Sequence, residues 1–299
     1  MTAAWVGLGV VLLLALLLGW FLLLVDRNPG ERDIAWLAGG PVLDAAQAQV
    51  YRAYLARHNG ARLAGGLVAI AVGLVVAARW SPGNWSVNVS VGLPPPGNLL
   101  IWWLGGVVLG TLLAESYRLP RRGAATPRLA VLDSRPAPPL PRVVLAARLL
   151  GGLAVAGGAA WLIGRHESAG LAGLAMALLF VGLAEATQRA ITDRPRPVGE
   201  PALTVDGRLR WFAGTSVAWL ELAGATLSLA TVLAAVGGWL DTVSLPPVAD
   251  GLARLGAGVP LLACVVVTVV AILRGRVRPP RGWQPLGQPL TVAAPGVVA

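Results

Sequence analysis

The stretch ARLAGGLVAIAVGLVVA (61–77) places one arginine directly ahead of an apolar run that is long enough to cross a lipid bilayer. A near copy, ARLLGGL, occupies 147–153 and also opens a long apolar run. A lone charge is costly inside hydrocarbon, so each arginine is expected at a membrane surface, where it anchors the start of a helix. The stretch therefore predicts a membrane-spanning helix with its arginine end at the interface.

The composition indicates a protein made largely of such helices. The 299 residues are 56% hydrophobic and only 13% charged, against about 25% charged in soluble domains, and the mean hydropathy is +0.69. All 24 basic residues are arginine, which is typical of a GC-rich bacterial genome, and the net charge is +10. Basic loops on one side of a membrane explain that charge, so no nucleic-acid partner is expected. The single cysteine, Cys264, excludes an intrachain disulfide.

Seven segments are apolar and long enough to span a bilayer. They predict an all-α polytopic bundle in one transmembrane domain over residues 1–275, followed by a disordered cytoplasmic tail over 276–299. The expected spans are 4–25, 63–79, 98–114, 144–164, 168–185, 216–240 and 255–273.

The arginines predict the orientation of these spans. The connections 26–62, 115–143 and 186–215 each hold at least five arginines, whereas 80–97 holds no charged residue. Arginine-rich connections lie on the cytoplasmic side of bacterial membranes. The strict alternation therefore predicts seven spans with the N-terminus outside and the C-terminus inside a bacterial plasma membrane.

Residues 43–60 predict an amphipathic helix on the inner membrane face. Their aromatic and apolar residues recur at helical spacing, and Asn59-Gly60 is a helix-ending pair. Arg52 and Arg57 would then reach the phosphates of anionic lipid headgroups. The alternative is a solvated helix that packs on the protein itself.

The two arginine-led hairpins, 63–114 and 144–185, share a second feature, because each ends in Leu-Ala-Glu at the same side of the membrane. A duplication and a chance match both stay open, since ARLGAGV (253–259) starts a span on the other side. Neighbouring helices of a hairpin bring entry and exit residues together. The pattern predicts an inner-leaflet charge ring, structural or ion-coupled, made of Arg62, Glu115, Arg148, Glu185 and Glu221.

Among the carboxylates of the sequence, Glu221 is the one expected deepest in the membrane. It would serve either as a proton or cation site or as part of a structural clamp whose arginines extend to lipid phosphates. The clamp is the favoured interpretation, because all five groups fall near an interface rather than at the bilayer centre.

Catalytic, cofactor-binding and metal-binding motifs are not found in the sequence. His58 and His166 are expected on opposite sides of the membrane, and Cys264 has no partner with metal-ligand spacing. Ser216 lacks the nucleophile-elbow pattern, and no histidine is expected near it in the membrane. Gly106-x-x-x-Gly110 is instead a spacing that favours close helix packing.

The stretch VYRAYLARHNGARLAGGL (50–67), together with VDGRLR (205–210), resembles a group of multi-pass membrane proteins from actinobacteria. The resemblance covers the inner helix, the first hairpin and the segment ahead of the sixth span. It implies a multi-pass protein of a bacterial plasma membrane and implies no particular activity or site residue.

These patterns together predict a non-enzymatic integral membrane protein, a scaffold or accessory subunit of a membrane complex. A small-solute or ion transporter is the first alternative, and a membrane-embedded lipid-modifying enzyme is the second. The expected partners are anionic headgroups at the inner face and another membrane protein or a second copy of the chain.

Overall fold

The computed structural model describes residues 30–39, 45–80, 99–116, 140–165, 168–193 and 200–276. These residues form helices and contain no strand, which confirms the all-α prediction for this part of the chain. The expected first span, 4–25, and the tail beyond 276 lie outside the described residues.

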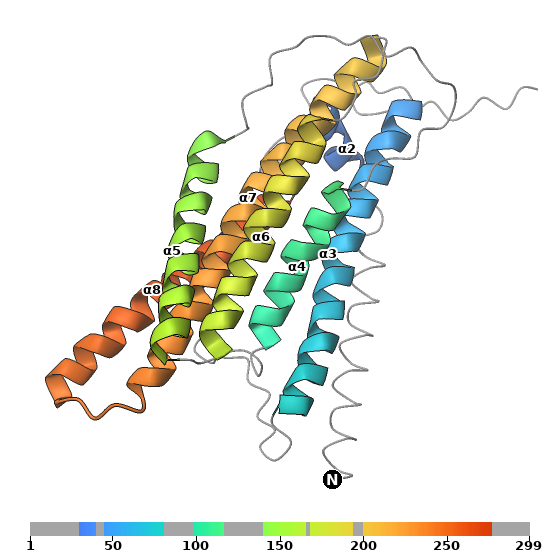
Figure 1. Cartoon of the computed structure of the whole chain (residues 1–299). Helices are drawn as coiled ribbons and strands as arrows, with labels where there is room; N and C mark the ends of the chain where they lie inside the picture. The colour runs from blue at the N-terminus through green and yellow to red at the C-terminus, as the bar shows by residue number, and fades with distance from the viewer. Residues whose placement is uncertain are drawn as a thin grey trace, which may run out of the picture.

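Seven helices follow one another along the described chain (Figure 1). They are α2 (Glu31–Ala38), α3 (Ala45–Trp80), α4 (Leu99–Ser116), α5 (Pro141–Arg165), α6 (Ser168–Thr192), α7 (Glu200–Leu240) and α8 (Pro247–Arg274).

Five of these helices, α3, α5, α6, α7 and α8, are long and apolar enough to cross a membrane. The apolar part of α4, Ile101–Glu115, is shorter. Each expected span from 63–79 to 255–273 falls within one of the helices α3 to α8. The exception is residue 98, the first residue of the span 98–114, which lies just outside the described residues. The structure therefore supports a multi-pass membrane protein.

Helix α7 occupies the centre of the bundle (Figure 1). It packs against α8, α5, α6, α4 and α2. Within its most apolar stretch 78% of the residues are buried, against 22–28% in the other four long helices. A helix that is apolar on every side is buried on every side, and the small residues of SVAWLELAGATLSLATVLAA (216–235) let neighbours approach it closely.

The apolar core is divided into two parts along the length of α7. The larger core joins α4, α5, α6, α7 and α8 around Leu104, Phe180 and Leu227. The smaller core joins α2 to the N-terminal parts of α3 and α7, and the rings of Trp36 and Phe212 lie 4.7 Å apart there. We call this end of the bundle, uppermost in Figure 1, the α2 end.

Helix α3 differs from the sequence prediction. The predicted helix 43–60 does not end at Asn59-Gly60, because one helix runs without interruption from Ala45 to Trp80. Its apolar face, including Tyr51 and Leu55, is buried against α2 and α7. Tertiary packing thus overrides the weak helix-ending preference of Asn-Gly. The apolar side of this segment packs on the protein, and the placement of Arg52 and Arg57 at lipid phosphates stays a prediction.

The connection expected over 186–215 is also largely helical. Helix α6 continues to Thr192, and α7 already begins at Glu200. Both extensions lie at the α2 end, where α7 packs Leu209 and Phe212 into the smaller core. Burial of these side chains explains why the helix starts well ahead of the expected membrane boundary.

Glycines set the separation of α3 and α4. A Cβ atom added to Gly65 would lie 2.8 Å from the Cα and 3.0 Å from the backbone N of Gly110. The neighbouring Gly66 faces the indole of Trp103 in the same way. Gly65 therefore permits backbone contact with the Gly106-x-x-x-Gly110 stripe, and Gly66 leaves room for the Trp103 side chain. Gly152 of ARLLGGL, by contrast, faces open space.

Gly65→Val should destabilise the fold, because the added atoms meet the backbone of α4, which cannot move aside. Overpacking of this kind costs about 1–3 kcal/mol or more of unfolding free energy. Thermal unfolding of the detergent-solubilised protein measures the effect. Gly182→Val in α6 is the matched control, since a Cβ there meets nothing within 4 Å. Equal melting temperatures for the two variants would contradict the close approach.

Candidate functional site

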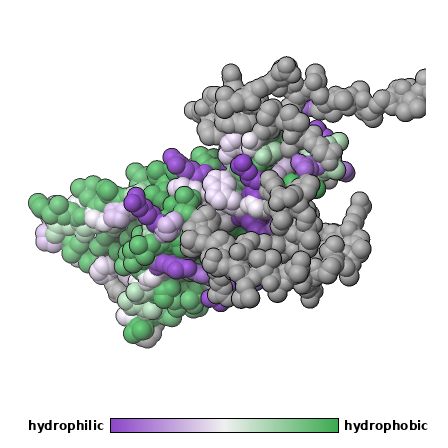
Figure 2. Space-filling view, turned by 90° about the horizontal axis from the view of Figure 1, so that it is seen from above, coloured by the Kyte–Doolittle hydropathy of each residue, from purple (hydrophilic) through white to green (hydrophobic). Residues whose placement is uncertain are grey.

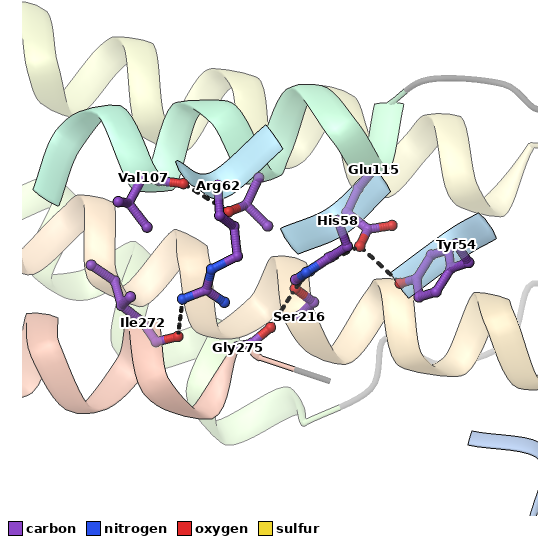
Figure 3. A network of polar contacts seen from close by, with 9 residues as sticks. Tyr54, His58, Arg62, Val107, Glu115, Ser216, Ile272 and Gly275 are labelled. Atoms are coloured by element: carbon purple, nitrogen blue, oxygen red, sulfur yellow. Dashed lines mark hydrogen bonds and ion pairs between the residues drawn. The ribbon is translucent and has the colours of Figure 1, made fainter. Parts of the chain in front are cut away.

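A buried group of polar side chains lies toward the α2 end, between the two apolar cores. Figure 3 shows this group from close by. We call it the His58 cluster; its members are Tyr54, His58 and Arg62 of α3, Glu115 of α4 and Ser216 of α7. The carbonyls of Ile272 and Gly275, at the end of α8, complete it. The side chains of His58 and Glu115 are only 1% and 2% exposed.

The hydrogen bonds of this cluster form a directed chain. Tyr54 donates its hydroxyl proton to Glu115 Oε1 at 2.8 Å. Ser216 donates to the carbonyl of Gly275 at 2.8 Å, so its oxygen is left to accept from His58 Nε2 at 3.2 Å. The same Nε2 faces Glu115 Oε1 at 3.3 Å. The network thereby assigns the proton of His58 to Nε2.

The cluster also satisfies the end of α8. The last carbonyls of a helix have no partner within the helix and carry the negative end of its dipole. Arg62 donates to the carbonyl of Ile272 at 2.9 Å, and Ser216 supplies the donor for Gly275. Side chains of α3 and α7 therefore hold the C-terminus of α8, while Glu115 ties α4 to α3.

A second group, the Arg148 cluster, contains Arg148 of α5, Glu185 of α6 and Glu221 of α7. Arg148 Nη2 donates to Glu185 Oε1, and Arg148 Nε lies 4.0 Å from Glu221 Oε1. The three side chains differ in exposure, at 56% for Arg148, 29% for Glu185 and 5% for Glu221. Figure 2 views the molecule from the α2 end. It shows hydrophilic residues gathered near the middle of the molecule, beside an apolar flank.

The five residues of the expected charge ring thus belong to two separate groups. Arg148 and Glu185 meet as the hairpin pattern predicts, and Glu221 joins them. In the other hairpin, Glu115 pairs with Tyr54 and His58, and Arg62 is directed to α8. The two arginines that introduce the near-repeats therefore act differently, because one caps a buried helix end and the other lies at the surface.

Ser216 has a histidine beside it, which the sequence analysis did not expect. The contact arises because α3 runs past the expected membrane boundary and brings His58 to α7. Serine, histidine and glutamate nevertheless do not form a nucleophilic triad. In such triads the two ring nitrogens serve different partners, whereas here Nε2 faces both Ser216 and Glu115. The hydroxyl proton of Ser216 is directed to a carbonyl.

Metal binding is not indicated by the described part of the chain. No three His, Cys, Asp or Glu side chains within it are placed to share a metal ion. Cys264 is a buried free thiol in α8, and His166 lies outside the described residues. The arrangement of both clusters is suited to holding helices together through charge-assisted hydrogen bonds.

Tyr54 and His58 are the residues that the sequence analysis missed. A usable signal exists, since Tyr51, Tyr54, Leu55, His58 and Arg62 recur every three or four residues and so share one face of a helix. Four of these residues already lie in the predicted helix 43–60, and Arg62 joins the same face when 45–80 is treated as a single helix.

Comparisons with protein families, curated proteins and solved structures give no match to this chain. The likeness of 50–67 and 205–210 to actinobacterial membrane proteins stays an interpretation of the sequence.

Ser216→Ala should lower the unfolding free energy by about 1–3 kcal/mol, because the buried carbonyl of Gly275 loses this donor. Thermal unfolding in detergent is the measurement. The matched control is Thr242→Ala, which also removes a hydroxyl bonded to a carbonyl, that of Trp239, but at an exposed position. The control should change stability by less than about 0.5 kcal/mol. If both variants unfold at the same temperature, the cluster does not hold the end of α8.

Proposed function

We propose that the chain is a multi-pass protein of a bacterial plasma membrane, with seven spans, the N-terminus outside and the C-terminus inside. The distribution of charge supports this orientation, because arginines concentrate at the α2 end and such ends face the cytoplasm. At the opposite end, the described helices carry three arginines, Arg79 of α3, Arg165 of α5 and Arg254 of α8. The described arginines at or near the α2 end include Arg32, Arg52, Arg57, Arg62, Arg142, Arg148, Arg189, Arg208, Arg210, Arg274 and Arg276.

Single-cysteine labelling tests the orientation, since Cys264→Ala provides a cysteine-free background. Thr2→Cys and Ser244→Cys should react with a membrane-impermeant maleimide in whole cells. Asp193→Cys should react only after permeabilisation, because it follows α6 at the proposed cytoplasmic side. Reversed labelling of positions 193 and 244 would overturn the orientation, and protection of position 2 would overturn the first span.

Within that topology we propose a non-catalytic role as a scaffold or accessory subunit of a membrane complex. The observation that carries this proposal is that the buried polar groups at the α2 end are hydrogen-bonded to other parts of the bundle. The donors of the His58 cluster are directed to helix carbonyls and to Glu115, which stabilises the arrangement of α3, α4, α7 and α8. Groups that are engaged in this way are not free to activate a substrate.

The polar side chains deeper in α7 are engaged in the same manner. Thr226, Ser228 and Thr231 donate to carbonyls one turn earlier in the helix. Thr226 also contacts the hydroxyl of Thr268 at 2.7 Å and so links α7 to α8. Transport would need polar groups that are open to a passing solute, so this geometry favours the scaffold over the transporter.

Helix α8 offers the surface for a membrane partner. It diverges from α7 away from the α2 end (Figure 1), leaving between them a pocket of about 220 Å³ lined by small residues such as Gly237 and Gly258. Its outward face carries exposed apolar side chains every three or four residues, the spacing of a helix-packing seam. They are Val248, Leu252, Leu255, Val259, Leu262, Val266, Val269 and Leu273.

Affinity purification from native membranes with mass spectrometry tests the role. A stoichiometric membrane partner should copurify with the wild type and be lost from Leu255→Ala/Leu262→Ala. The matched control is Leu149→Ala/Leu153→Ala on α5, whose leucines are similarly exposed. A protein that purifies alone and carries a solute across vesicle membranes would instead be a transporter. A solitary protein that modifies added lipid would be an enzyme.

A further inference from the structure

The Arg148 cluster is unbalanced in charge. One guanidinium from α5 faces two carboxyl groups, Glu185 of α6 and Glu221 of α7. Arg148 Nη2 donates to Glu185, whereas the distance from Arg148 Nε to Glu221 Oε1 is 4.0 Å. At that distance the two charges attract each other, but no hydrogen bond forms.

Glu221 is the buried member of the cluster. Its side chain is 5% exposed, and its Oε1 has no hydrogen-bond partner among the described residues. A buried carboxylate without hydrogen bonds is strongly unfavourable in an apolar setting. If both carboxyl groups were ionised, the cluster would carry a net negative charge with only one arginine to offset it. One bound proton removes that charge.

We propose that Glu221 is a reversible proton-binding site, which exchanges its proton by way of Glu185 and the exposed Arg148. The route is supported by the exposure gradient from Glu221 through Glu185 to Arg148. The ligand is a proton rather than a metal ion, because the guanidinium occupies the second carboxylate. This inference goes beyond a scaffold role, since it gives the bundle a group whose charge changes.

The charges that act on Glu221 come from the helices packed against α7. Arg148 of α5 and Glu185 of α6 are the ionisable groups whose charges influence it. On α8, Arg274 lies over the ring of Trp219, 5.5 Å from its centroid. On α4, Glu115 is held by Tyr54 and His58.

Loss of the proton changes what Arg148 contacts. An ionised Glu221 competes with Glu185 for the guanidinium, which is exposed enough to move. The proton therefore decides whether α5 is tied mainly to α6 or also to the central helix α7. Small shifts of this kind alter the packing of neighbouring helices.

Labelling with dicyclohexylcarbodiimide tests the proposal on the full-length protein in detergent and in lipid vesicles. This apolar reagent reacts with protonated carboxyl groups in apolar surroundings, and peptide mass spectrometry locates the adduct. Glu221 should be labelled near neutral pH, and its labelling should fall as the pH rises. Glu185 should remain unlabelled, because Arg148 holds it in an ion pair.

Two variants sharpen the test. Glu185→Gln frees Arg148 for Glu221, so labelling of Glu221 should fall at a fixed pH. Arg148→Gln removes the cation, so Glu185 should become labelled while Glu221 stays labelled. Size-exclusion chromatography checks that each variant is folded, and the wild-type mapping does not depend on any variant.

A second readout avoids dependence on reagent access. Infrared spectroscopy should show a carboxylic C=O band that shifts in D2O and is missing from Glu221→Gln. Absence of both the adduct and the band from the folded wild type would overturn the proposal. The proposal would also be overturned if the extent of Glu221 labelling changed neither with pH nor in the Glu185→Gln variant.

Discussion

Helix α7 is contacted by α2, α4, α5, α6 and α8, and this crowding limits what its side chains can be. In its most buried stretch, the hydroxyl groups of Thr226, Ser228 and Thr231 donate to the helix's own carbonyls. Small residues let the surrounding helices approach closely enough for van der Waals contact, which drives helix association in lipid. The positions of α4, α5, α6 and α8 follow from where they meet α7, whereas α3 packs mainly on α4.

The ends of the helices present a different physical problem, because their terminal carbonyls need donors from elsewhere. The structure solves it for α8 by placing Arg62 and Ser216 against its last turn. The same side chains lie between the larger and the smaller apolar core. A polar layer at this level therefore joins the long helices to the part formed by α2 and the N-terminal ends of α3 and α7.

The two clusters differ in how their buried carboxyl groups are satisfied. In the His58 cluster, Glu115 accepts from Tyr54 and lies beside a histidine N–H. In the Arg148 cluster, a surface arginine is held by one carboxylate, while Oε1 of the buried Glu221 has no hydrogen-bond partner in the part of the chain that the structure describes. A carboxyl group with donors stabilises one arrangement, whereas an unsatisfied one is where a change of charge can act. This contrast separates the structural role of the first cluster from the proton site proposed for the second.

The sequence by itself determined the helical membrane class, the helices that follow 61–67 and 147–153, and the meeting of Arg148 with Glu185. Apolar run length and hairpin adjacency are local properties, so they can be read from the order of residues. Only the tertiary structure decided that α3 continues through Asn59-Gly60, that α6 and α7 extend into the connection 186–215, and that His58 meets Ser216. These features depend on burial against helices distant in the sequence, because the free energy of packing Tyr51, Leu55 and Phe212 outweighs the local preference of the chain to end a helix.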